Sequence, residues 1–218
     1  MHVGILGGTG PAGSGLGIRL AAAGLEVTIG SRTKDRAQET VEALTAKYPD
    51  RTFLLDAGDN KRAASADVVV IATPWDAAAA TAKAVANQLA GKVVISMANA
   101  LARVDNEFQP LIPPRGSVAA SVAAVLPQSL VAAAFHHLPA KELADIEHPV
   151  ESDVLICSDH PSATETTAEI VRLIAGCRPL DAGRLSNAAP IESFAAVILQ
   201  LNVRYKTRSA IRLTGINA

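Results

Sequence analysis

The sequence is poor in aromatic residues, in net charge and in cysteine, and each scarcity excludes a class of protein. Phe, Trp and Tyr make up only 3% of the 218 residues, so Ala, Val, Leu and Ile must fill the core. The formal net charge of −1 provides no basic field that would favour nucleic acid or an anionic membrane. The hydrophobic fraction of 49% predicts a chain that folds around a substantial core.

The cysteines and the longest uncharged stretch exclude two further classes. Cys157 and Cys177 do not form the cysteine framework of a secreted protein. Residues 117–135 are uncharged and about as long as a membrane span, but Pro127 interrupts them and Ala predominates, so we expect a buried helix, a turn and a buried strand. Because strand-like residues begin at His2, no leader peptide is expected, and the predicted location is the cytoplasm.

Short apolar runs alternate with helical patterns, which predicts βαβ units and a parallel sheet. We therefore predict an α/β fold, with a Rossmann-type parallel sheet in residues 1–135 and a smaller C-terminal α/β domain in residues 136–218 that ends in a long helix. The connections 99–116 and 136–149 are predicted to be irregular. Strands are expected at 2–6, 26–30, 67–72, 92–97, 153–158 and 179–181, and helices at 14–23, 34–47, 76–89, 163–175 and 191–213.

A glycine-rich turn follows the first predicted strand and opens the first predicted helix, which is the context of a dinucleotide-binding turn. Its three spaced glycines permit a tight turn, a close approach of the backbone to a pyrophosphate, and close packing of helix and strand. The alternative is that they serve only the tight turn. The expected cofactor-binding residues are Gly8, Thr9, Gly10, Pro11, Ala12 and Gly13.

The end of the second predicted strand indicates which dinucleotide binds. NAD enzymes place a carboxylate there, but in this sequence Ser31 and Arg32 follow the strand and the first carboxylate is Asp35. A hydroxyl and a guanidinium satisfy a ribose phosphate, so NADP(H) is preferred over NAD(H). The alternative is an ordinary helix start with a capping hydroxyl and solvated cations.

The sequence lacks the catalytic residues of several common classes of enzyme. The glycine turn also fits a short-chain dehydrogenase, but neither Tyr48 nor Tyr205 has a Lys four positions on. No nucleophile elbow or Walker-type loop occurs, and no pair of metal ligands has a second pair at ligand spacing, so no metal site is expected. His136 is the one apparent acid or base. Hydride transfer to a second redox ring needs chiefly stacking and orientation, which favours a partner cofactor.

Motifs at residues 2–10, 30–32, 73–75, 136–140 and 178–187 resemble, in order and spacing, those of the F-420-dependent NADP oxidoreductases. The resemblance covers nearly the whole chain. It implies direct hydride exchange between NADP(H) and the deazaflavin coenzyme F-420, with the deazaflavin lying over the nicotinamide.

The resemblance also implies roles for individual residues. Thr9, Ser31 and Arg32 would hold the ribose phosphate, and His136, the expected catalytic residue, and Ser193 would contact the deazaflavin. The alternatives without a binding role are that His136 is a hydrogen-bonded histidine at the end of a strand and that the hydroxyl of Ser193 bonds to the backbone of its own helix. Residues expected beside the dinucleotide are Thr73, Pro74, Trp75 and Ala98.

The sequence departs from the family pattern at Ala195, where a Thr is often found, so the resemblance does not predict a polar deazaflavin contact at this position. Two other functions remain open: reduction of another acceptor, such as a flavin, an imine or a metal chelate, and sensing of NADP(H) without catalysis. The apolar face of the last helix, which includes Ile198, Leu201 and Ile211, predicts a homodimer or a sealed domain cleft.

Overall fold

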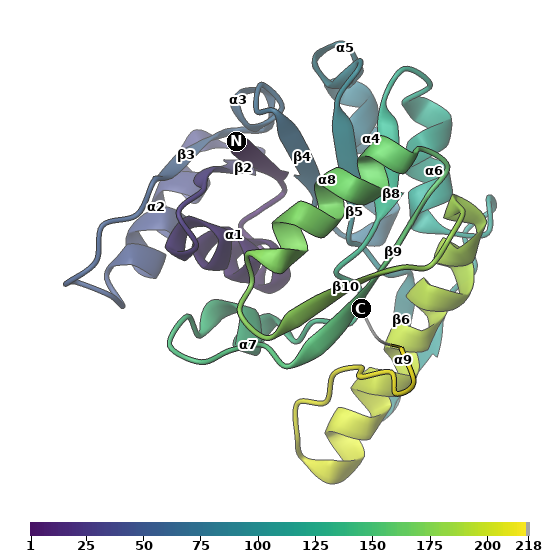
Figure 1. Ribbon diagram of the computed structural model, residues 1–218. Coiled ribbons are helices and arrows are strands. Elements are labelled where there is room, and N and C mark those ends of the chain that lie inside the picture. The colour runs from purple at the N-terminus through teal and green to yellow at the C-terminus, as the bar shows by residue number, and fades with distance from the viewer. Residues whose placement is uncertain (217–218) are drawn as a thin grey trace.

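The protein is built around one eight-stranded sheet, seen in a computed structural model that describes residues 1–216 (Figure 1). The strand order is β10-β9-β8-β5-β4-β1-β2-β3. Neighbouring strands are parallel except β8 and β9, which are antiparallel. The strands are β1 (His2–Leu6), β2 (Glu26–Ser31), β3 (Leu55–Asp59), β4 (Val68–Ile71), β5 (Val93–Ser96), β8 (Leu130–Ala133), β9 (Ser152–Ser158) and β10 (Cys177–Asp181).

Helices cover both faces of the sheet, and alternate residues of a strand enter different cores. In β4, Val68 and Val70 belong to the core that also contains residues of α1, α2 and α8, whereas Val69 and Ile71 belong to the core that contains residues of α4 and α6. The α/β fold class with a mainly parallel sheet and a long C-terminal helix is therefore confirmed. The helices are α1 (Pro11–Ala22), α2 (Lys34–Thr45), α3 (Asn60–Ala63), α4 (Trp75–Ala84), α5 (Ala86–Leu89), α6 (Val118–Val125), α7 (Ala140–Ala144), α8 (Pro161–Arg172) and α9 (Ala188–Tyr205).

The structure differs from the sequence prediction in several segments. α3 was not expected, and the helix predicted over 76–89 is broken at Val85 into α4 and α5. β3 was not expected, and the connection 99–116 contains an antiparallel hairpin of β6 (Leu101–Val104) and β7 (Glu107–Pro110). The connection 136–149 contains α7. The last helix ends at Tyr205 instead of residue 213, because Lys206 adopts a left-handed conformation with φ of 51°.

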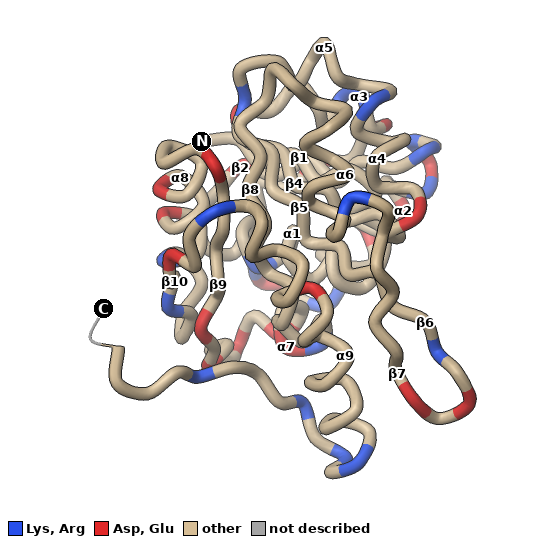
Figure 2. The backbone as a smooth tube through the Cα atoms, turned by 90° about the vertical axis from the view of Figure 1, so that its right-hand side faces the viewer, with Lys and Arg blue, Asp and Glu red and all other residues tan. Residues whose placement is uncertain are grey.

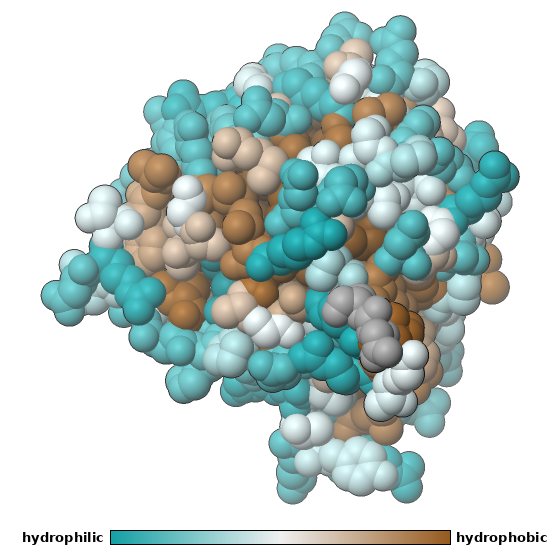
Figure 3. All heavy atoms as spheres, viewed as in Figure 1, coloured by the Kyte–Doolittle hydropathy of each residue, from teal (hydrophilic) through white to brown (hydrophobic). Residues whose placement is uncertain are grey.

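The sheet continues across residue 135, where the domain boundary was predicted, because β9 pairs with β8 and β10 pairs with β9. The division into two domains stays a prediction. Within residues 1–216, no helix combines the length and apolar character needed to cross a bilayer. Hydrophilic residues dominate the rim of the face in Figure 3, while apolar residues show between them.

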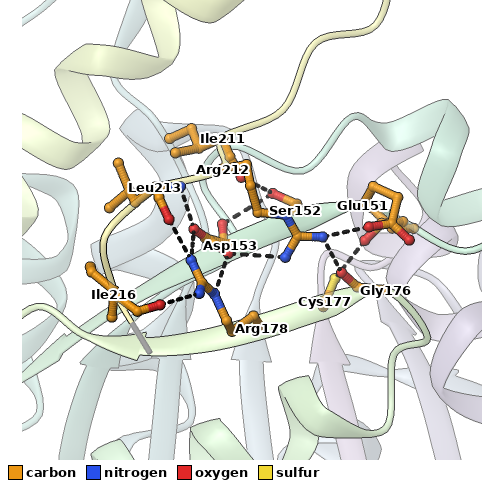
Figure 4. A network of polar contacts seen from close by, with 11 residues as sticks. Glu151, Ser152, Asp153, Gly176, Cys177, Arg178, Ile211, Arg212, Leu213 and Ile216 are labelled. Atoms are coloured by element: carbon orange, nitrogen blue, oxygen red, sulfur yellow. Dashed lines mark hydrogen bonds and ion pairs between the residues drawn. The ribbon is translucent and has the colours of Figure 1, made fainter. Parts of the chain in front are cut away.

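The segment after α9 is held against the end of the sheet by the carboxylate of Asp153 (Figure 4). This buried group accepts two hydrogen bonds from Arg178, both of 2.8 Å, one of 3.1 Å from Arg212 and one of 2.6 Å from the backbone N–H of Leu213. The hydrogen bonds from Arg178 lower the pKa of Asp153 to about 2. The backbone N–H of Asp153 also donates to the carbonyl of Ile211. These bonds replace the helix predicted beyond residue 205.

Two buried charged groups connect the elements that carry the site. The guanidinium of Arg19 in α1 donates to the carbonyls of Leu143 and His148, at 3.1 and 2.8 Å, and so ties α1 to the α7 loop. The carboxylate of Glu192 in α9 accepts from the N–H groups of Val118 and Ala119, at 2.7 and 3.0 Å, and so caps α6. Burial raises the pKa of Glu192 to about 7.

Candidate cofactor-binding site

The glycine-rich turn connects β1 to α1 at the carboxyl edge of the sheet. Gly7 has a φ of +67°, and a Cβ there would lie 2.3 Å from the methyl group of Thr73. A Cβ on Gly13 would lie 2.9 Å from both Ala72 and Gly8, so this glycine permits close packing of helix and strand. Gly10 differs from both, because a Cβ there would meet nothing within 4 Å and φ is −76°. The fold does not require glycine at position 10, whereas close approach of a phosphate would.

Contacts from β2 and α3 hold the turn in place. The N–H of Gly8 donates to the carbonyl of Gly30 at 2.8 Å. The N–H of Gly7 donates to the side-chain oxygen of Asn60 at 3.1 Å. Asn60 begins α3, directly after β3, and was not predicted from the sequence. It fixes the turn in a conformation that presents the N-terminus of α1 to an anion.

A cavity of 420 Å³ lies beside the turn and contains Ser31 and Arg32, as the sequence predicted for the ribose-phosphate end of the dinucleotide. Ser31 is buried, whereas Arg32 is exposed. Asp59 also lines the cavity, but one oxygen of its carboxylate accepts from the N–H of Arg62 at the start of α3. Lys61 lies in the same wall.

A second cavity, of 250 Å³, connects the ribose-phosphate end to the glycine turn. It shares Ser31, Arg32 and Asn60 with the first cavity. Gly7, Thr9, Thr73 and Pro74 complete the connection, and Arg36 of α2 adds a second guanidinium. The two cavities together form a cleft that has cations at one end and backbone N–H groups at the other.

Buried polar atoms without hydrogen-bond partners, on four side chains, mark the opposite side of the site. In the part of the chain that the structure describes, the unpartnered atoms are Thr73 Oγ1, Ser96 Oγ, Asn99 Oδ1 and both ring nitrogens of His136. These residues lie at or just beyond the carboxyl ends of β4, β5 and β8, which are neighbours in the sheet. Buried polar atoms are normally hydrogen-bonded, so this row of unpaired atoms makes the edge of the sheet a candidate ligand-binding surface.

His136 is the centre of this row. Its side chain is buried, and desolvation together with the neighbouring His137 lowers its pKa to about 3. The imidazole is therefore neutral at pH 7 and offers one N–H donor and one acceptor nitrogen. His137 is oriented differently, because its Nε2 lies 2.8 Å from the carbonyl oxygen of Ile191 in α9.

A third cavity, of 190 Å³, contains His136 and extends to α9. Ala12 of α1 lies in its wall, so this cavity adjoins the glycine turn. Ala195, which stands where the family often carries Thr, faces the same cavity together with Asn202 of α9 and Ser209. The structure therefore brings the predicted turn and the predicted catalytic histidine to one edge of the sheet.

Seven predicted site residues lie outside the walls of these cavities, and three of them, Trp75, Ala98 and Ser193, also lie outside the glycine turn. Trp75 begins α4 and packs half-buried against the core on that side of the sheet. Ala98 is buried in the same core. Ser193 is half-buried on α9, two residues before Ala195. Their roles in binding stay predictions. Gly8, Gly10, Pro11 and Gly13 form the turn and the first residues of α1.

The sequence is similar throughout its length to characterised reductases. Residues 2–100 match the family described as NADP oxidoreductase, coenzyme F420-dependent. The chain is 35% identical to the F420-dependent NADP reductase of Methanocaldococcus jannaschii, with 99% of each chain covered. It is also 35% identical to the F420-dependent NADP reductase of Methanothermobacter thermautotrophicus, with 99% of this chain and 96% of that protein covered.

The fold is shared with solved structures. A crystal structure from Arthrobacter sp. FB24 superposes with a TM-score of 0.81 at 22% identity, over 95% of this chain and 96% of that one. The resemblance predicted from the motifs of both halves is confirmed by the full-length similarity to the archaeal reductases. The chain belongs to the family of F420-dependent NADP reductases.

Proposed function

We propose that the protein transfers a hydride directly between NADP(H) and the deazaflavin coenzyme F420. The observation that carries the proposal is the row of unpartnered polar atoms at the ends of β4, β5 and β8, which continues the cleft that begins at Arg32. When bound, the nicotinamide and deazaflavin rings would supply the hydride donor and acceptor. The residues of this chain bind and orient the two rings and exclude water.

The two ends of the site have different tasks. Ser31, Arg32 and Arg36 would bind the ribose phosphate, and the glycine turn would bind the pyrophosphate. Neutral His136 would hydrogen-bond a ring in the buried cavity without carrying a charge that opposes hydride transfer. Two rings must face each other there, and the apolar side chains Ile198 and Leu199 of α9 form part of the wall.

The direct test mixes the purified protein with NADPH and oxidised F420 and follows the loss of deazaflavin absorbance. Turnover with NADPH that greatly exceeds turnover with NADH is the expected result. Absence of turnover with F420, combined with NADPH oxidation by free flavin or by an imine, would assign the protein to another acceptor. Binding of NADPH with no acceptor at all would favour a sensing role.

We also propose that the protein is a homodimer joined through α9. Phe194, Val197, Leu201 and Tyr205 recur on one face of this helix, with 42%, 48%, 38% and 70% of their surface exposed. Some of the apolar residues of α9 are visible at the lower right of Figure 3. A second copy of the chain would cover this stripe and bury its apolar surface.

Charge supports the choice of a second copy as the occupant. The β6–β7 hairpin projects from the body and carries Asp105 and Glu107 at its tip, while Arg204 and Lys206 lie at the end of α9 (Figure 2). The hairpin is fixed to α9 by the hydrogen bond from the N–H of Phe108 to the side chain of Gln200, 3.2 Å long. In a twofold dimer, acidic tips and basic helix ends are available for mutual pairing.

The oligomeric state is measured by size-exclusion chromatography with light scattering. Leu201→Glu should give a monomer, whereas the control Leu173→Glu, at a site on α8's end with 43% exposure, should leave the dimer intact. A monomeric wild-type protein would contradict the proposal. The cytoplasmic location stays a prediction.

A further inference from the structure

Asn99 lies beyond the end of β5, and its side-chain orientation is fixed by its partner. The Nδ2 atom donates to the backbone carbonyl of His136 at 3.0 Å. A carbonyl accepts but never donates, so the nitrogen end of the amide must face it. The oxygen end is therefore turned away from His136, where Oδ1 is buried without a partner.

The backbone that Asn99 holds is an unusual turn. Phe135, directly before His136, has a φ of +67°, which is rare for a residue other than glycine. The hydrogen bond from Asn99 to the carbonyl of His136 therefore connects the end of β5 to the turn that carries the histidine. Asn99 and His136 also line the same 190 Å³ cavity.

The unpartnered oxygen specifies the chemistry of its ligand. A carboxamide oxygen accepts hydrogen bonds only, so the group that satisfies it must carry an N–H or O–H donor. His136 supplies no such donor to Asn99, since both of its ring nitrogens are unpartnered as well. A ligand that presents a carboxylate at this position would leave Oδ1 unpaired and add repulsion.

We propose that Asn99 is a specificity-determining residue that accepts a hydrogen bond from an amide N–H of the hydride-carrying ring. This inference rests on the proposed function and deepens it. The carboxamide of nicotinamide and the lactam of the deazaflavin both offer such an N–H. The ligand class is therefore a planar redox ring with an amide donor at its edge, and the experiment distinguishes its two sources.

The test compares two substitutions at this position. Asn99→Leu removes both the donor and the acceptor at similar volume, while Asn99→Asp keeps an oxygen acceptor and loses the donor to His136. Asn106→Asp, on the exposed hairpin tip, controls for the added charge. Affinities for NADPH and for oxidised F420 are each measured by titration, without turnover, and melting temperatures are recorded in parallel.

We expect Asn99→Leu to weaken one of the two cofactors by about tenfold to a hundredfold, the effect of leaving a buried polar group unpaired. Asn99→Asp should recover part of that loss. If only the affinity for NADPH falls, the donor to Asn99 is the carboxamide of the nicotinamide. If only the affinity for F420 falls, the donor is the lactam of the deazaflavin. A role in holding the turn alone predicts equal effects of Leu and Asp on turnover with unchanged affinities, and that result overturns the inference.

Failure of the proposed function is distinguishable from failure of this inference. If wild-type protein binds NADPH but never reduces F420, the proposed reaction fails while the NADPH titration still tests Asn99. The dinucleotide with a nicotinic acid in place of nicotinamide adds a second criterion. If the carboxamide is the donor, wild-type protein should bind this analogue more weakly than NADP⁺, and Asn99→Leu should narrow the difference.

Discussion

Replacing His136 with Phe should stabilise the empty protein while it abolishes efficient turnover. The wild-type imidazole is buried, and neither nitrogen has a partner at normal hydrogen-bond geometry; the backbone of Met97 makes only a weaker contact that raises the pKa against the effect of burial. An unsatisfied buried polar group costs about 1–3 kcal/mol, and an apolar ring of similar shape avoids this cost. The same substitution removes the group that we propose orients the bound ring, so stability and activity should change in opposite directions.

The stability gained by His136→Phe should increase as the pH falls, because the pKa of His136 in the folded protein is lowered from 6.5 to about 3. Between these pH values the unfolded histidine binds a proton and the folded one does not, so the wild-type protein loses stability as the pH falls below 6.5. Each pKa unit is worth about 1.4 kcal/mol. pH 5.0 lies about 1.5 units below the pKa of the unfolded histidine. His136 should therefore lower the free energy of unfolding of the wild-type protein by about 2 kcal/mol more at pH 5.0 than at pH 7.5.

The measurement is urea unfolding of both proteins without cofactor at pH 5.0 and 7.5. Subtracting one protein from the other isolates His136, since His137 and Glu192 titrate in both. His137→Phe is the matched control. The ring of His137 already has a hydrogen-bond partner in the carbonyl of Ile191, so the protein should lose stability when this histidine is replaced. Equal pH dependence in wild type and His136→Phe would refute the argument that a buried neutral imidazole is held here.

Three further substitutions test other parts of the structure. Arg32→Ala should weaken NADPH by about tenfold and leave NADH unchanged, whereas equal effects on both would refute the ribose-phosphate role. Asn60→Ala removes the acceptor for Gly7 and should weaken NADPH and NADH alike, by about fivefold in titrations. Asp153→Ala should cost about 3–5 kcal/mol and release the segment after α9 to proteolysis, and unchanged cleavage there would contradict the role of Asp153 in holding this segment.

The central strands could be predicted from the sequence because their information is local. β1, β4 and β5 are buried on both faces, so each is a continuous apolar run bounded by polar or turn residues. β3 has no such run, since its sequence LDAGD contains two carboxylates and a glycine. It forms because its backbone pairs with β2 along the edge of the sheet, which is a tertiary interaction.

The end of the last helix could not be predicted for a related reason. Helical periodicity continues past Tyr205, but the segment that follows is bound by Asp153, a residue more than fifty positions earlier in the chain. The bonds that Asp153 and Arg178 make to this segment are absent from any local window of sequence. The hairpin at 101–110 was missed for a different reason, because its strands are only four residues long and β7, with the sequence EFQP, carries little apolar character.

The residues of the candidate site likewise fall into those that the sequence predicts and those that only the structure reveals. The glycine turn, Ser31, Arg32 and His136 follow predicted strands, so topology alone brings them to one edge of the sheet. Asn60 and Arg36 were not predicted, because Asn60 follows the missed strand β3 and Arg36 lies within the exposed first turn of α2. A cation on a helix surface gives no signal until a cavity is seen beside it.

The unpartnered atoms of Thr73, Ser96, Asn99 and His136 connect stability to function in this fold. Each unpaired atom costs free energy in the protein without ligand, and under the proposed function a bound ring that supplies a partner recovers this cost. Binding to the folded state alone must then raise stability by RT ln(1 + [L]/Kd), about 2.7 kcal/mol at a hundredfold excess over Kd. The stability advantage of the His136→Phe variant over the wild-type protein should therefore shrink or reverse as NADPH and F420 are added. The substitution removes the cost of the buried imidazole, but it also removes the hydrogen bond that the bound ring would make to it.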